Sequence, residues 1–160
     1  MKKFILVVAA ILFIYFAWDT ACYRFGFYID LNPQESATTF VTADEEQIYF
    51  SVSKDGQTWE TINGSKPILR SDVGERGVRD PHIIRSPEGD KFFLIATDLS
   101  IYNRRADSNR WGTCQVSGSK GIVIWESTDL VNWSPARRVK VAVDNAGCTW
   151  APESVYNEKT

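Results

Sequence analysis

The chain has 160 residues, of which 18 are Lys or Arg and 20 are Asp or Glu, so its formal net charge is −2. No nucleic-acid partner is expected from this balance, because phosphate binding requires a clustered excess of basic side chains. His82 is the one histidine, and no two of the three cysteines form a C-x-x-C pair. Multi-histidine zinc sites and zinc ribbons are therefore excluded, and no metal site is predicted.

An apolar segment follows the first three residues. Lys2 and Lys3 precede an uninterrupted apolar run at positions 4–18, which is shorter than the roughly 20 residues of a membrane-spanning helix and typical of a secretory signal. We predict a hydrophobic helix over residues 1–21 that acts as a signal peptide or a membrane anchor, with a buried core helix as the alternative. The protein would then be secreted or anchored outside the cytoplasm, with no other membrane contact. Whether the leader is cleaved stays open.

Short strands are predicted after this leader. Residues 22–46 are interpreted as a linker or first-strand region, and residues 47–160 as one domain. β-branched and aromatic runs bounded by turn residues predict strands at 47–52, 82–85, 91–97, 122–126, 139–143 and 151–156. No segment after residue 30 keeps a helical apolar period over the length of a helix. The fold class predicted is therefore all-β.

A repeated motif favours one all-β architecture. The pattern S-x-D-x-x-x-W occurs twice, 74 residues apart, and a repeat of this kind is typical of β-propeller blades. We expect each Asp to cap a turn and each Trp to pack between blades, with a catalytic role for the Asp residues as the alternative. The two copies comprise Ser53, Asp55 and Trp59, and Ser127, Asp129 and Trp133.

The length of the chain is too small for a closed propeller. The residues after position 21 hold fewer than two periods of 74 residues, whereas propellers close with about four to eight blades. The expectation is an incomplete propeller of about two blades, formed by the front part of a larger protein.

Two proline-containing motifs carry the candidate site. In the first, GVRDPHI, Asp80 precedes Pro81, whose fixed φ sets the direction of the preceding carboxylate. The carboxylate could face a ligand in the propeller channel, or it could belong to a turn in which it pairs with Arg79. The second motif is W-A-P-E, in which Trp150 could cover the apolar face of a sugar and Glu153 could accept hydrogen bonds from hydroxyls. The alternative for this motif is a core Trp with a surface Glu.

Two further residues are candidates for the pocket. His82 and Asp98 lie at ends of predicted strands and are assigned to substrate binding together with Trp150 and Glu153. For His82, a core or solvated position is the alternative. Sugar and linkage specificity, the oligomeric state and a Cys114–Cys148 disulfide are left open.

Four segments occur in a fixed order along the chain: R-D-P-H-I, K-F-F-L-I-A-T, S-T-D-L-V-N-W and W-A-P-E. In this order they resemble the opening half of a glycoside hydrolase family 43 domain, over roughly residues 47–160. The resemblance implies a five-bladed β-propeller and an inverting glycosidase that acts on α-L-arabinofuranosides or β-D-xylosides of plant-type polysaccharides. It implies that Asp80 is the general base and that residues 150–153 line the pocket. Nothing here matches the family's general acid or the residue that tunes the pKa of that acid, so the chain would be a truncated portion whose activity alone is doubtful.

The sequence leaves two alternative functions. The first is a non-catalytic, carbohydrate-binding propeller fragment that uses Trp150 and nearby aromatic residues. The second is a related five-bladed fructan hydrolase, which would need a catalytic Asp before Arg79 in a segment that residues 30–33 do not match. In all cases the partner is a carbohydrate. No cofactor is expected, although a structural Ca²⁺ in the channel of the full-length protein is left open.

Overall fold

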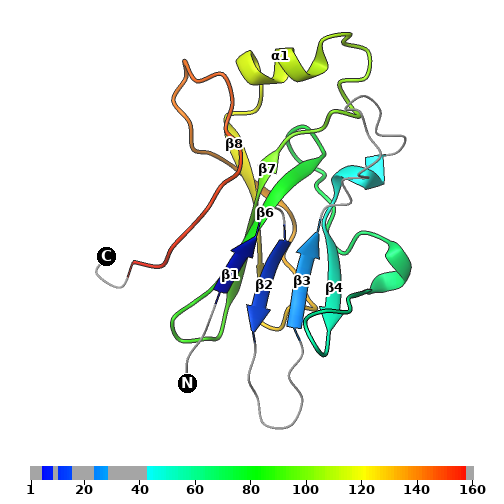
Figure 1. Cartoon of the computed structure of the whole chain (residues 1–160). Coiled ribbons are helices and arrows are strands. Elements are labelled where there is room, and N and C mark those ends of the chain that lie inside the picture. Colours follow the sequence, from blue (N-terminus) through cyan, green and yellow to red (C-terminus); the bar gives the residue numbers. More distant parts are fainter. Residues whose placement is uncertain (1–4, 9–10, 16–23, 29–42, 158–160) are drawn as a thin grey trace.

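The structure is a computed structural model of the whole chain, and it describes residues 5–8, 11–15, 24–28 and 43–157. These residues form two antiparallel sheets with little helix (Figure 1), which confirms the all-β prediction. The first sheet contains, in spatial order, β1 (Ile5–Val8), β2 (Ile11–Tyr15), β3 (Arg24–Tyr28), β4 (Tyr49–Ser53) and β5 (Glu60–Thr61). The second contains β6 (Val78–Arg85), β7 (Phe92–Asp98), β8 (Gly121–Ser127) and β9 (Arg137–Lys140).

The predicted N-terminal hydrophobic helix is wrong where the structure describes that segment. Residues 5–8 and 11–15 are the strands β1 and β2, which pair with each other, and β2 pairs with β3. Ile, Val, Leu, Phe and Tyr suit strands, and an apolar run of this length does not distinguish strand from helix by its period. Within the described residues no helix is both long enough and apolar enough to cross a bilayer. The role of this segment as a leader or anchor stays a prediction.

The second sheet is a four-stranded meander in which side chains alternate between two faces. Ile83 of β6 pairs with Leu94 of β7, which pairs with Trp125 of β8. All three side chains are buried, at 2%, 0% and 1% exposure. This row faces the first sheet, because Ile48 and Phe50 belong to the same buried cluster.

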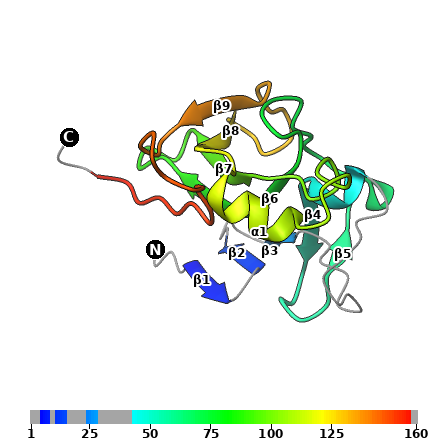
Figure 2. The ribbon, with the colours of Figure 1, turned by 90° about the horizontal axis from the view of Figure 1, so that it is seen from above.

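The two sheets therefore share one hydrophobic core. Figure 2 shows them as neighbouring layers, with α1 (Arg110–Val116) over one end of the strands. Trp133 contributes to the junction, since its ring meets that of Phe50 edge to face at 5.8 Å between centroids. This geometry adds about 0.5–1.5 kcal/mol beyond the burial of area. Trp133 thus lies between the two sheets, whereas Trp59 is half-buried. Packing of these Trp residues between propeller blades stays a prediction.

The first copy of the repeated motif forms a locally closed turn. Ser53 donates to Asp55 Oδ1 at 3.0 Å, and the backbone N–H groups of Gln57 and Thr58 donate to the same oxygen at 2.8 Å each. These bonds, that from Thr58 first, hold the pKa of the Asp55 carboxyl well below its usual range. The turn-capping role predicted for Asp55 is confirmed.

The second copy repeats the arrangement. Ser127 donates to Asp129 Oδ1 at 3.2 Å, and the N–H groups of Val131 and Asn132 donate to that oxygen at 2.9 and 2.7 Å. Donation from Asn132, through its backbone and then its side chain, lowers the pKa of the Asp129 carboxyl to about 2. Both Asp residues of the motif are therefore structural, and the catalytic alternative has no support at either position.

Other boundaries differ from the predictions. The segment 151–156 is described but is not a strand, and the last strand is β9, which ends at Lys140 rather than at position 143. The helix α1 was not predicted, because its seven residues are too few for an apolar period to appear. Two 3₁₀ turns, η1 (Ala43–Glu46) and η2 (Asn63–Ser65), complete the elements.

Candidate active site

Asp80 lies on a β-bulge in β6, which is the edge strand of the second sheet. Arg79 pairs with Thr97 and His82 with Ile95, so one extra residue is accommodated between these pairs. Pro81 fits there, since a bulge on an edge strand does not require its missing N–H. The bulge re-aims the Asp80 side chain, which is exposed to solvent.

One buried hydroxyl joins Asp80 to the second proline motif. Thr97 donates to Asp80 Oδ2 at 2.9 Å, and the backbone N–H of Ala151 donates to Thr97 Oγ1 at 2.7 Å. Thr97 is fully buried at 0% exposure. Two motifs separated by some 70 positions in the sequence thus meet at a single side chain, as the proposed pocket required.

The backbone is strained at both residues that are hydrogen-bonded to Thr97, namely Asp80 and Ala151. Asp80 has a φ of +48° and Ala151 a φ of +47°, and each precedes a proline. Non-glycine residues rarely adopt the left-handed region, and the residue before proline ordinarily takes an extended conformation. Such strain costs about 1–3 kcal/mol per residue and gathers at functional sites. The paired outliers therefore mark this end of the sheet as a candidate site.

Arg79 does not pair with Asp80. Its guanidinium donates to Glu46 Oε1 at 2.7 Å and lies 5.0 Å from the centre of the Trp111 ring. The Glu46 carboxylate is fully buried and also accepts from the Ser100 hydroxyl at 2.7 Å. The alternative of an Asp80–Arg79 ion pair is therefore wrong: Arg79 anchors the start of β6 and leaves the Asp80 carboxylate to Thr97 among the described residues.

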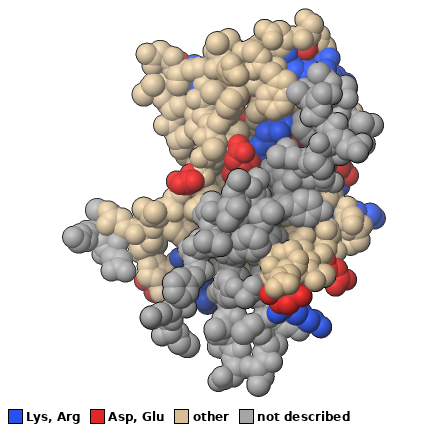
Figure 3. Space-filling view, viewed as in Figure 1, with Lys and Arg blue, Asp and Glu red and all other residues tan. Residues whose placement is uncertain are grey.

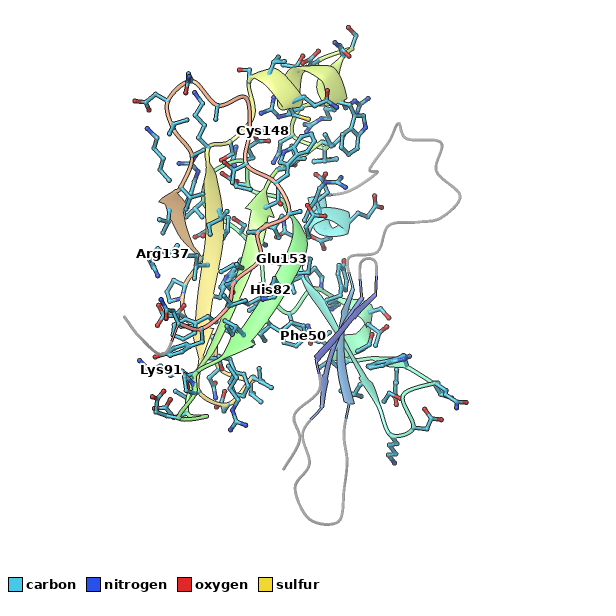
Figure 4. All side chains as sticks on the ribbon, turned by 60° about the vertical axis from the view of Figure 1, so that its left-hand side comes forward. Phe50, His82, Lys91, Arg137, Cys148 and Glu153 are labelled. Atoms are coloured by element: carbon cyan, nitrogen blue, oxygen red, sulfur yellow. The ribbon has the colours of Figure 1, made fainter. Side chains whose placement is uncertain are left out.

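The C-terminal segment crosses the face of the second sheet that lies opposite the core. His82 and Ile83 point to opposite faces, and His82 Nε2 lies 3.1 Å from the carbonyl oxygen of Ser154. Figure 4 shows His82 beside Glu153, which is exposed. Trp150 is 37% exposed. The structure thus brings Asp80, His82 and Glu153 together, and Trp150 belongs to the segment that crosses this face.

Asp98 has a different environment. It is 1% exposed, and its carboxylate accepts from Ser119 at 2.5 Å, from Arg138 Nε at 2.7 Å and from the backbone N–H of Glu75 at 2.7 Å. Gly74, with φ +58°, is pressed against it so closely that a Cβ would overlap the carboxylate. These contacts favour a structural role for Asp98 over the predicted substrate contact.

Cys114 and Cys148 are free thiols. Cys114 on α1 is buried and Cys148 is half-buried. Burial raises the pKa of the Cys114 thiol. The disulfide that the sequence left open is not formed.

The surface groove lies apart from the candidate site. On the face in Figure 3, the Lys and Arg atoms of the described residues lie in small groups beside acidic ones, as in the exposed Arg70–Asp44 ion pair. A groove of about 420 Å³ is lined by Trp125 and by residues of the segments 68–72 and 131–136. None of its lining residues belongs to the candidate site.

Comparison with known proteins identifies the family of this chain. A sequence model of a family described as a probable glycosyl hydrolase domain, related to glycoside hydrolase family 43, matches residues 35–160. The chain belongs to this glycosyl hydrolase family. An α-L-arabinofuranosidase of Bifidobacterium longum subsp. longum is 34% identical over 145 residues, which are 88% of this chain but 12% of the relative. The chain therefore spans a small part of the relative's length, and the predicted resemblance is confirmed.

Two residues that shape the candidate site, Thr97 and Glu46, were not predicted from the sequence. Thr97 ends an apolar strand with no polar neighbour before it, and Glu46 lies in an acidic stretch, where it resembles a surface residue. Their contacts come from strand pairing and burial, for which no local pattern exists. The paired proline motifs were the available signal, and they led to Asp80, Trp150 and Glu153.

Proposed function

We propose that this chain is the front part of a β-propeller glycosidase that hydrolyses α-L-arabinofuranosides or β-D-xylosides with inversion. The observation that carries the proposal is the bulge that presents Asp80, strained and exposed, beside the Trp150 segment. Support for the reaction class comes from membership of the glycosyl hydrolase family.

In this mechanism Asp80 acts as the general base. Its carboxylate takes a proton from a water molecule, the water oxygen bonds to the anomeric carbon, and the glycosidic C–O bond breaks. The leaving oxygen takes a proton from a carboxylic acid about 6.5–9.5 Å from the base, a separation that leaves room for the water. That acid would come from parts of the protein outside these residues, in line with the small share of the relative that this chain covers.

The base needs a carboxylate that is held in place and has an oxygen available to water. Thr97 donates to Oδ2 at 2.9 Å and so fixes one of the two carboxylate oxygens. No hydrogen bond to Oδ1 occurs among the described residues, and the side chain is exposed. Asp80 thus has both properties, whereas Asp98 is occupied on both oxygens.

The sugar would be held on the face that the C-terminal segment crosses. Trp150 offers a partly exposed ring to the C–H groups of a sugar, and the exposed Glu153 can accept from hydroxyls. His82 would act on this face through Ser154, whose carbonyl oxygen it contacts. The second sheet would be one propeller blade with β6 at the channel, because β6 is the edge strand that carries Asp80. An extracytoplasmic location and a channel Ca²⁺ stay predictions.

The test is Asp80→Asn in the complete protein that carries this chain, assayed on 4-nitrophenyl α-L-arabinofuranoside and β-D-xyloside. Loss of the base should lower turnover by about 10²–10⁴-fold with the melting temperature retained. Asp72→Asn, an exposed carboxylate in the groove away from the site, is the matched control. NMR of the first-formed sugar should show inverted anomeric configuration. Full activity of Asp80→Asn would remove Asp80 from the base role, and wild-type protein that binds sugars without turnover would favour the carbohydrate-binding alternative.

A further inference from the structure

We propose that Thr97 is a positioning residue that holds the Asp80 carboxylate in its reactive orientation and couples it to the Trp150–Glu153 segment. The inference rests on the proposed role of Asp80 as general base. It concerns a residue to which the sequence assigned no role. The sugar itself would not touch Thr97, because this residue is fully buried.

The direction of the hydrogen bonds follows from the donors available. A threonine hydroxyl has one proton and two acceptor lone pairs. The N–H of Ala151 can only donate, so it occupies a lone pair of Thr97 Oγ1 at 2.7 Å. The single Thr97 proton is then directed to Asp80 Oδ2 at 2.9 Å. Donation into the hydroxyl polarises its O–H bond and strengthens the second hydrogen bond. This chain of bonds therefore fixes the position of Asp80 Oδ2.

Thr97 is well placed to fix a geometry. It lies in β7, an inner strand, where it pairs with Arg79 on one side and Ile122 on the other. Its β-branched side chain has few χ1 rotamers, and burial restricts them further. Asp80, in contrast, is exposed on an edge strand. The buried Thr97 therefore sets the position of the exposed Asp80 carboxylate.

The same hydroxyl links two strained residues. Asp80 and Ala151 both have left-handed φ values, of +48° and +47°, and strain of this kind persists only where the surroundings enforce it. Thr97 contacts both of them. Removal of the Thr97 hydroxyl should therefore release both Asp80 and Ala151. The orientation of the Asp80 carboxylate and the placement of Trp150 should then change together.

The experiment is the steady-state kinetics of Thr97→Val in the complete protein. Valine keeps the shape and removes the hydroxyl. We expect kcat to fall about 10-fold because the Asp80 carboxylate is no longer held in place, and KM to rise because the Trp150 segment loses its anchor. Thr97→Ser, which keeps the hydroxyl, should retain the wild-type kcat and KM. A loss of packing alone would lower the melting temperature without changing kcat or KM.

Controls separate this inference from the proposed function. Thr149→Val removes a buried hydroxyl that has no hydrogen-bond partner among the described residues, so kcat and KM should stay at the wild-type values. If Asp80→Asn is inactive but Thr97→Val keeps the wild-type kcat and KM, the inference is wrong and the proposed function stands. If Asp80→Asn is fully active, the proposed function is wrong, and the inference that rests on it is wrong too. If Thr97→Val does not fold, Thr97→Ala and Thr97→Ser decide. Equal kcat values in the two variants overturn the inference, and a loss of kcat in Thr97→Ala alone supports it.

Discussion

The turn at Asp129 and the bulge at Asp80 use the same side chain in opposite ways. The Asp129 carboxylate accepts bonds from residues two and three positions further along its own turn. The Asp80 carboxylate accepts from Thr97, 17 positions away on the neighbouring strand, and its backbone is strained. The first carboxylate is satisfied by its neighbours in sequence, whereas the second retains an oxygen for a ligand.

This difference explains which acidic residues of the chain are candidates for chemistry. A carboxylate that closes its own turn has a lowered pKa and stabilises the fold, as at Asp55 and Asp129. A carboxylate on a bulge, braced from another strand, gains little local stability and is available to substrate. The surroundings of the residue, and not its type, decide between the two roles.

The largest expected difference between Asp80 and Asp129 is the effect of their substitution on turnover. Asp80→Asn and Asp129→Asn should behave oppositely: the first loses about 10²–10⁴-fold in kcat, and the second stays within about twofold of the wild type while its melting temperature falls. Steady-state kinetics and thermal unfolding of the complete protein measure both quantities. Equal loss of activity in the two variants would contradict the separation of roles.

The next largest effect is on folding, through the buried partner of Arg79. Glu46→Gln keeps the shape but leaves the Arg79 guanidinium without its charged partner in a buried site, which should lower the free energy of unfolding by about 3–5 kcal/mol. Denaturant unfolding measures the change, with the exposed Glu88→Gln as control. An unchanged midpoint would mean that Arg79 finds another partner or water.

A smaller effect is expected at the junction of the sheets. Trp133→Leu removes the edge-to-face contact with Phe50, worth about 0.5–1.5 kcal/mol, together with part of the buried area. Thermal unfolding should show a moderate loss, and Trp59→Leu offers a comparison with the other copy of the motif. No change on Trp133→Leu would contradict the role of this ring between the sheets.

The smallest expected effect is the contribution of Asp129 to the pH dependence of stability. Its pKa is about 2 in the folded chain against an ordinary value of 3.8, so its stabilising effect is present above about pH 4 and is lost as the pH falls toward 2. Melting temperatures of wild type and Asp129→Asn should converge over that range. A constant difference down to pH 2 would show that the turn is not held by the ionised carboxylate.

Local patterns determined the elements whose contacts are local. The S-x-D-x-x-x-W turns were predicted from sequence because their donors lie two and three residues from the acceptor, and β7 and β8 because their apolar runs are bounded by turn residues. The sequence also identified Asp80 and Trp150 as candidates, since each stands in a proline motif. The apolar N-terminal run, however, suits a helix and a strand equally, and only pairing with β3 decided between them where it is described.

Tertiary structure alone decided the arrangement around the site. Three features depend on residues far apart in the chain. They are the bulge in β6, the buried contact between Glu46 and Arg79, and the Thr97 hydroxyl that bonds to both Asp80 and Ala151. Such contacts depend on strand register and on which polar groups the core encloses, and neither leaves a periodic signature in the sequence.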